Sequence, residues 1–241
     1  MGDLSGFPLA QIQKLISELQ DYSAPQVYNP WRDFDGELDI GAAAPAIRRR
    51  QLAQYLQLRL DQARYIFVAE ALGYQGGHFS GIAMTSERML LGYHDRVDAR
   101  TVLGGPGERT SHCASSGIRE ICRQKGFNEP TATIVWGAIL DYCASPREVV
   151  LWNIFPFHPY KHADRLTNRT PTPAEQQLGL RYFQMLHEGF PLTRVVAIGA
   201  KADQTLSQFG IAHDSVPHPA NGGANDFRAG VRALFGNCAG I

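Results

Sequence analysis

Three short apolar runs containing β-branched residues alternate along this chain with longer stretches of helical spacing. They are RYIFVAE at 64–70, EVVLWNI at 148–154 and TRVVAIG at 193–199. Short runs of this kind are typical of strands buried on both faces of a parallel sheet. Consecutive parallel strands must be joined by a crossover, usually a helix, so the alternation restricts the chain to a small set of α/β folds.

The segments around these runs supply the helices. In residues 8–20 the apolar side chains recur on one helical face, and residues 44–63 open with a proline near the first turn. Further helical patterns occupy 173–188 and 224–235, while TATIVWGAIL at 131–140 fits either a strand or a helix. Strands separated by helices place helices on both faces of the sheet.

The expected fold class is therefore α/β, a three-layer αβα arrangement with a central, mostly parallel sheet. The chain has 241 residues and contains no internal repeat, low-complexity segment or linker. This length is within the range of one large domain. We expect a single domain over residues 1–241, with residues 1–63 as its N-terminal helical part.

Composition limits the partners and the compartment. Lys+Arg and Asp+Glu are both 23, so no overall charge attracts a polyanion, although a local basic patch remains open. No apolar stretch reaches about 18 residues, so we expect no membrane span. The four cysteines are scattered, which indicates reduced thiols in a cytoplasmic protein. No metal site is expected, because Pro159 lies between His158 and His162, the two histidines with ligand-like spacing.

Three polar side chains of different types follow the three apolar runs. Glu70 ends the first run, Asn153 lies near the end of the second, and His218 follows the third after a further helix. Ligands of open α/β sheets bind outside the carboxyl ends of the strands, so we expect these three side chains to form a site. Local roles remain open for each: Glu70 capping a helix or pairing with an arginine, and Asn153 and His218 stabilising turns.

Five motifs occur in the order found in one known family. They are AEALG at 69–73, GGHFSG at 76–81, LWNIFPFHP at 151–159, VVAIGAKA at 195–202 and VPHPA at 216–220. The set resembles the uracil-DNA glycosylase superfamily, and the first motif is similar to the Gly-Glu-Ala-Pro-Gly motif of its iron-sulfur branch. Leucine replaces the proline of that motif, and alanine replaces the serine of the family's terminal His-Pro-Ser motif.

The resemblance implies that a base flipped out of DNA enters a pocket and stacks on a side chain there. It implies Phe79, in GGHFSG, as the ring on which the base stacks. Met84 is a second candidate, since GIAMTS also aligns with the family segment that carries this stacking residue. Asn153 is implied as the amide that reads the edge of the base. Gly73 and Tyr74 compete for the position that blocks the methyl group of thymine.

The resemblance also implies the catalytic groups. His218 would donate a hydrogen bond to the departing base, and Glu70 would orient or deprotonate the attacking water. The proline after His218 restricts the backbone that aims the imidazole. A loop pressing on the DNA is implied at Pro219, Ala220, Asn221 and Gly222.

The predicted function is a monofunctional DNA base-excision repair glycosylase that removes uracil or a related deaminated base. We expect a monomer whose partner is DNA containing a damaged base. No cofactor is expected, because the cysteines do not reproduce the spacing of the iron-sulfur branch. A catalytically inactive nucleic-acid-binding relative is the alternative, since the first and last motifs have drifted. A small-molecule hydrolase on a similar sheet is a third reading, although the chain has no Gly-x-Ser-x-Gly motif.

Overall fold

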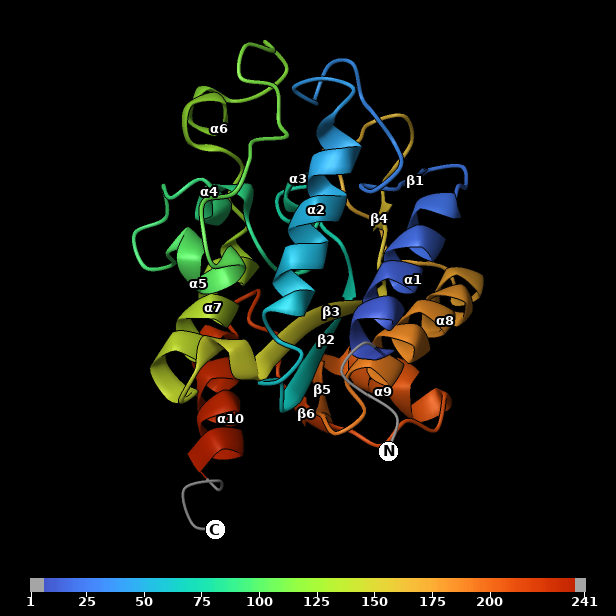
Figure 1. Cartoon of the computed structure of the whole chain (residues 1–241), viewed down its shortest axis with the longest axis vertical. Coiled ribbons are helices and arrows are strands. Elements are labelled where there is room, and N and C mark those ends of the chain that lie inside the picture. The colour runs from blue at the N-terminus through green and yellow to red at the C-terminus, as the bar shows by residue number, and fades with distance from the viewer. Residues whose placement is uncertain (1–6, 237–241) are drawn as a thin grey trace.

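A four-stranded parallel sheet forms the centre of the protein, which was analysed as a computed structural model describing residues 7–236 (Figure 1). Its strand order is β3-β2-β5-β6, and all neighbouring strands run parallel. The strands are β2 (Tyr65–Ala71), β3 (Val149–Phe155), β5 (Arg194–Ile198) and β6 (Asp214–Val216). The predicted α/β fold with a central parallel sheet is thereby confirmed.

Strand register brings the predicted polar positions to one edge. Ala69 of β2 lies opposite Asn153 of β3, and Ile198 of β5 lies opposite Val216 of β6. All seven residues of β3 are buried, as are the first five of β2, which explains their nearly continuous apolar sequence. The residues that leave the carboxyl ends of these strands therefore start close together.

Ten α-helices and one 3-10 helix surround the sheet in the described part of the chain. The longer ones are α1 (Phe7–Asp21), α2 (Ala44–Gln57), α7 (Pro130–Tyr142), α8 (Pro173–Gly189), α9 (Ala200–Gln208) and α10 (Ala224–Gly236). The short ones are α3 (Gly77–Ser80), α4 (Glu87–Leu90), α5 (Ala99–Leu103), α6 (Glu120–Lys125) and the 3-10 helix η2 (Pro146–Glu148).

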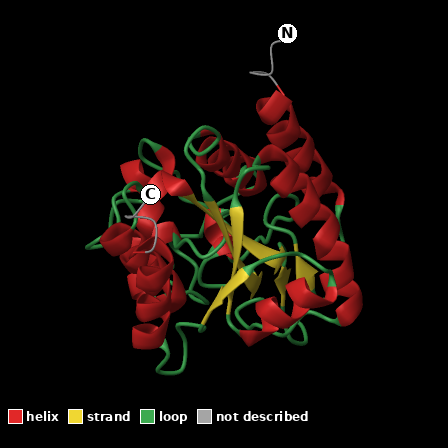
Figure 2. Ribbon diagram, turned by 90° about the horizontal axis from the view of Figure 1, so that it is seen from below, coloured by secondary structure: helices red, strands yellow, loops and turns green. Residues whose placement is uncertain are grey.

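The helices form a layer on each face of the sheet, as Figure 2 shows. Helix α8 packs on β3 and α9 packs on β5 and β2, with α1 lying against α8. Helix α10 packs on β6 and against α7. This division agrees with right-handed crossovers. Connections that step in opposite directions along the strand order then cover opposite faces of the sheet.

Two predicted helical segments differ in detail from the structure. The segment predicted as helix over 44–63 ends at Gln57, because the chain turns there to enter β2. The buried Arg59 stabilises this turn by donating to the carbonyls of Tyr55 and Val149, at 2.7 and 2.9 Å. The ambiguous segment 131–140 lies within helix α7, which has proline at its first position.

The region beyond the carboxyl edge of the sheet has no strong periodicity in the sequence. It contains helix α3, which follows β2, and a two-stranded antiparallel pair of β1 (Val27–Tyr28) with β4 (His158–Pro159), whereas α5 packs on η2 at the amino end of β3. The segments that leave β2 and β3 are joined where Leu72 donates its backbone N–H to the carbonyl of Phe157 at 3.3 Å. These connections build the walls above the sheet edge.

Candidate functional site

A cavity of about 210 Å³ opens at the carboxyl edge of the sheet. It contains all three of the polar side chains that the sequence predicted to meet, Glu70, Asn153 and His218. They come from β2, β3 and the loop after β6. The residues that line it are Ala69, Glu70, Ala71, Leu72, Gly73, Met84, Glu129, Thr131, Asn153, Asn168, Arg169 and His218.

Glu70 forms an ion pair with a lysine at the cavity wall. The Lys201 ammonium in the first turn of α9 lies 3.2 Å from one Glu70 carboxylate oxygen and donates to the other at 3.3 Å. The same ammonium donates to the hydroxyl of Thr170 at 2.6 Å. The Glu70 side chain is 27% exposed, so its carboxylate is fixed in position yet reachable from the cavity.

His218 has the geometry of a neutral hydrogen-bond donor. Its Nδ1 accepts a hydrogen bond from the backbone N–H of Ala220 at 3.1 Å, so the neutral ring carries its proton on Nε2. Burial lowers the pKa of His218 below its usual value, although the nearby Glu70 carboxylate acts in the opposite direction. The ring is therefore neutral near pH 7 and presents Nε2–H as a donor.

Two glycines allow the backbone to approach His218. Gly199 has a φ of +84°, and a Cβ atom placed there would lie 2.8 Å from the Cβ of His218. A Cβ at Gly223 would lie 2.3 Å from the His218 carbonyl oxygen. The position of the imidazole thus depends on glycine at both places.

Asn153 supplies an unpaired amide oxygen to the cavity. The residue lies inside β3 and is only 1% exposed. Its Oδ1 atom is buried and has no hydrogen-bond partner in the structure. Since buried polar atoms in folded proteins are nearly always paired, this oxygen is available for a ligand.

The two candidates for the stacking platform lie in different places. Met84 lines the cavity and adopts a positive φ of 46°. Phe79 does not line it: this ring is fully buried and stacks on Phe127 with ring centres 4.1 Å apart. It belongs to a separate apolar cluster, because the short helix α3 directs Phe79 away from the cavity and toward Leu38 and Ile118.

Of the pair Gly73 and Tyr74, only Gly73 lines the cavity. The backbone N–H of Tyr74 donates to the side-chain oxygen of Asn168 at 3.0 Å, and its ring packs against the apolar cluster of Phe79. This bond ties the turn after β2 to the segment after β4. The Tyr74 ring therefore does not occupy the part of the cavity next to Gly73.

The predicted DNA-contacting loop directly follows His218. Pro219 is buried, whereas Asn221 and Gly222 are exposed. Both exposed residues have a positive φ, 56° for Asn221 and 88° for Gly222. The half-buried Ala220 contributes its backbone N–H to the imidazole, as described above. The loop thus lies at the surface beside the mouth of the cavity.

Sequence reasoning missed Glu129, Thr131, Asn168 and Arg169, which also line the cavity. Arg169 is held by Glu175 through two hydrogen bonds of 2.6 and 2.7 Å. Burial raises the pKa of Glu129 to about 7. These residues follow no strand of the sheet, so the rule that found Glu70 does not reach them. The one local signal is Glu129 directly before the proline that begins α7.

The two histidines considered for metal binding have different surroundings in the structure. His158 contacts His78 instead, with 2.8 Å between their Nδ1 atoms, and its Nε2 donates to the Thr167 carbonyl at 2.8 Å. Burial lowers the pKa of His158 to about 4, so the ring is neutral. His162 lies in an exposed turn. Among residues 7–236, no group of three or more histidine, cysteine, aspartate or glutamate side chains is arranged to hold a metal ion.

The cysteines that the structure describes are free thiols. Cys113 is exposed, Cys122 is buried and Cys143 is intermediate. Cys238 lies outside the described residues. Of the helices described, none is both long and apolar enough to span a membrane.

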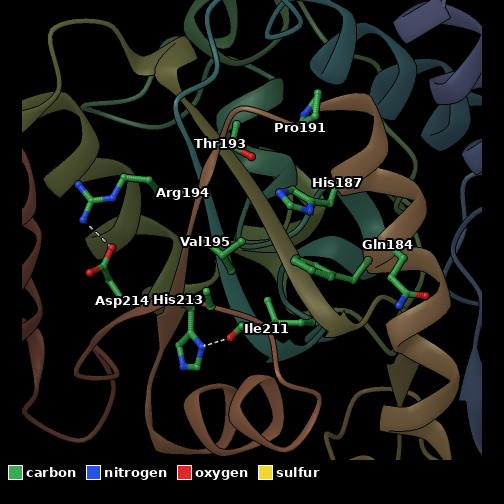
Figure 3. A pocket seen from close by; sticks show the side chains of 11 residues that line it. Gln184, His187, Pro191, Thr193, Arg194, Val195, Ile211, His213 and Asp214 are labelled. Carbon is green, nitrogen blue, oxygen red and sulfur yellow. Dashed lines mark hydrogen bonds and ion pairs between the residues drawn. The ribbon is translucent and has the colours of Figure 1, made fainter.

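A larger hollow of about 740 Å³ lies between α8 and the amino ends of β5 and β6 (Figure 3). Its wall carries the ion pair of Arg194 with Asp214 at 2.7 Å, and His213 bonded to the Ile211 carbonyl at 2.7 Å. None of the side chains predicted for the site line it. Ligands of parallel sheets bind at the carboxyl edge, so the smaller cavity is the candidate site.

The structure is an α/β domain with a four-stranded parallel sheet and with a carboxylate, an amide and an imidazole at the carboxyl edge of that sheet. No family model matches the sequence, and no curated protein is similar to it. The fold is similar to a solved structure of wild-type SMUG2 from Pedobacter heparinus, a member of the uracil-DNA glycosylase superfamily, with a TM-score of 0.59. The two chains are 12% identical, over 95% of this chain and 97% of SMUG2. At this identity the likeness shows a shared fold.

Proposed function

We propose that this protein is a DNA glycosylase that hydrolyses the N-glycosidic bond of uracil or a related deaminated base. The observation that carries the proposal is the meeting of Glu70, Asn153 and His218 in one cavity of a glycosylase-like fold. A base inside a duplex is out of reach, so the base must leave the helix and enter this cavity. Met84 then provides an apolar surface for one face of the ring.

Asn153 is suited to reading a deaminated pyrimidine. Its unpaired oxygen accepts a hydrogen bond from the N3–H of uracil, and its amide N–H donates to O4. Cytosine has an acceptor at N3 and a donor at C4, which reverses the pattern. A fixed amide therefore rejects cytosine, because both groups would stay unpaired on burial.

Bond cleavage distributes charge in a way that the cavity matches. The bond from the sugar C1′ to the base breaks with both electrons going to the base, and the Nε2–H of His218 stabilises the charge that grows on O2. The oxygen of a water molecule bonds to C1′, while Glu70 accepts the proton of that water. The Glu70 carboxylate also stabilises the positive sugar in the transition state. The base anion then takes up a proton from solvent.

Two departures from the family motifs keep the contacts that shape the site. Leucine stands at position 72 where the related motif has proline, and its N–H makes the bond to Phe157 that proline lacks the donor to form. Alanine stands at position 220 in place of serine, and the contact to His218 comes from its backbone. Both observations favour an active enzyme over an inactive relative.

DNA binding in this proposal is local. The exposed loop at Pro219, Ala220, Asn221 and Gly222 would press on the strand beside the vacated position. Because the chain has no net charge, phosphate contacts must come from individual side chains around the cavity. We propose that the protein acts as a monomer, in the cytoplasm, without a cofactor.

The test is release of free base from oligonucleotides that carry one uracil, hypoxanthine or xanthine, as single strands and as duplexes. Wild-type protein should release at least one of these bases, and Glu70→Gln and His218→Ala should each suppress the release. Glu108→Gln is the matched control, since it removes a carboxylate that is 58% exposed and outside the cavity. DNA binding without release of any base would support the inactive relative instead.

A further inference from the structure

A second carboxyl group enters the cavity from the start of helix α7. Glu129 immediately precedes Pro130, and its backbone N–H donates to the Ser86 hydroxyl at 2.8 Å, which fixes the residue. Its Oε2 atom is buried and has no hydrogen-bond partner. The structure therefore fixes a carboxyl group beside the cavity although no described residue bonds to its Oε2 atom.

Two glycines make the room for this carboxyl group. A Cβ atom at Gly76 would lie 2.0 Å from the Oε2 of Glu129, and one at Gly73 would lie 3.4 Å from its Oε1. Gly73 itself lines the cavity. The turn after β2 thus leaves space that the Glu129 side chain fills, and one of its oxygens lies at the wall where Gly73 is.

Among residues 7–236, no basic side chain forms an ion pair with Glu129. Arg169, the one basic group other than histidine on the lining, is bound by Glu175, and Lys201 is bound by Glu70. A buried polar group without a partner costs free energy, so such groups are retained where a ligand satisfies them. Among the described lining residues, three buried side-chain oxygens make no hydrogen bond: Oε1 of Glu70, which is ion-paired with Lys201, Oδ1 of Asn153, and Oε2 of Glu129, which lies on the Gly76 side of its carboxyl group.

We propose that Glu129 is a specificity-determining residue whose carboxylate accepts a hydrogen bond from a second ring N–H of the extruded base, other than the one that Asn153 reads. Uracil, whose one ring N–H bonds to Asn153, does not offer this contact. This inference rests on the glycosylase function proposed above. Asn153 both donates and accepts, whereas an ionised carboxyl group only accepts. A base with a C–H, an N-methyl group or an acceptor facing Glu129 leaves the carboxylate unpaired and is rejected.

The acid-base behaviour of the cavity supports this role. The titratable groups on the described lining are Glu70, Glu129, Arg169 and His218. Burial alone raises the pKa of Glu129 to about 7, so the group is protonated below that pH and accepts hydrogen bonds freely only above it. Base release should rise as the pH increases through about 7. The change in rate that follows the titration of His218 should occur at lower pH, because burial shifts the pKa of His218 below 6.5.

The experiment compares wild-type protein with Glu129→Gln, which keeps the size of the side chain and removes its charge. The value of kcat/KM is measured between pH 5.5 and 9 for a released base that has this second ring N–H, and for its analogue with that N–H replaced by C–H. We expect wild type to lose about 10- to 100-fold on the analogue and to show a limb near pH 7. Glu129→Gln should lose the rise near pH 7, and its preference for the N–H base should be weaker than that of wild type, because its neutral amide oxygen is a poorer acceptor than a carboxylate.

The outcomes separate this inference from the function on which it rests. If wild type releases no base at all, the proposed function fails and the role of Glu129 fails with it. If wild type is active and Glu129→Gln keeps the same limb and the same preference, Glu129 only fills space beside Gly76 and the inference is wrong. Thermal unfolding of both proteins shows whether the variant is folded, and Glu108→Gln controls for the loss of one negative charge.

Discussion

Gly199→Ala tests whether the position of His218 depends on the close approach of the chain after β5. Gly199 has φ +84° and ψ 159°, a backbone conformation open essentially to glycine alone. The added Cβ would lie 2.8 Å from the Cβ of His218 and 3.2 Å from its Cδ2. Since ordinary contacts begin at 3.4 Å, the histidine must retreat by about 0.6 Å.

The substitution should therefore affect both stability and catalysis. The strained backbone costs about 1–3 kcal/mol. For a chain of this size, about 2–4 °C are lost per kcal/mol, so the melting temperature should fall by about 2–12 °C. A displacement of this size in a catalytic group lowers the rate of base release about 10- to 100-fold. The measurements are thermal unfolding and single-turnover release of the base.

Gly210→Ala is the matched control for Gly199→Ala. Gly210 also has a positive φ, +67°, but an added Cβ there meets no atom within 4 Å. It should therefore lose some stability and keep the full rate of base release. If Gly199→Ala is folded and releases base as fast as Gly210→Ala, the close approach does not control the position of His218.

Three further predictions concern the other side chains of the cavity. Lys201→Met should change stability by less than about 1 kcal/mol, because the ion pair is partly exposed, yet slow base release about tenfold by freeing Glu70; an unchanged rate would show that the pair does not hold the carboxylate. Asn153→Ala should lower kcat/KM about 10- to 100-fold, measured on the best substrate, with loss of DNA affinity alone as the contrary result. Glu70→Gln should move the NMR titration midpoint of His218 to lower pH, because the Glu70 charge raises that pKa; an unchanged or higher midpoint would contradict the electrostatic coupling of Glu70 to His218.

The sequence predicted the parts of the molecule that depend on local pattern. β2, β3 and β5 are short apolar runs, and the residues that follow their carboxyl ends meet because parallel register requires it. Glu70 and Asn153 could therefore be placed without any knowledge of the loops. The extent of α2 could not, because the turn that ends it depends on Arg59 reaching the carbonyl of Val149, 90 residues away.

The walls of the cavity were beyond the reach of the sequence for a similar reason. His78 and His158 are 80 residues apart, and their contact fixes the segments that carry Gly73 on one side and Asn168 on the other. Both histidines lie within quoted motifs, GGHFSG and LWNIFPFHP, but nothing in either motif shows that the two rings meet. The same long-range packing decides that Met84, and not Phe79, lines the cavity.

The measurement that tests the central claim most directly is single-turnover release of free base from a duplex with one uracil, hypoxanthine or xanthine, using excess protein. We expect wild type to release free base and leave an abasic site, and we expect both Glu70→Gln and His218→Ala to bind the same duplex without releasing it. Bound DNA with no base released by wild type, or equal release by all three proteins, would contradict the assignment of this cavity as a glycosylase site.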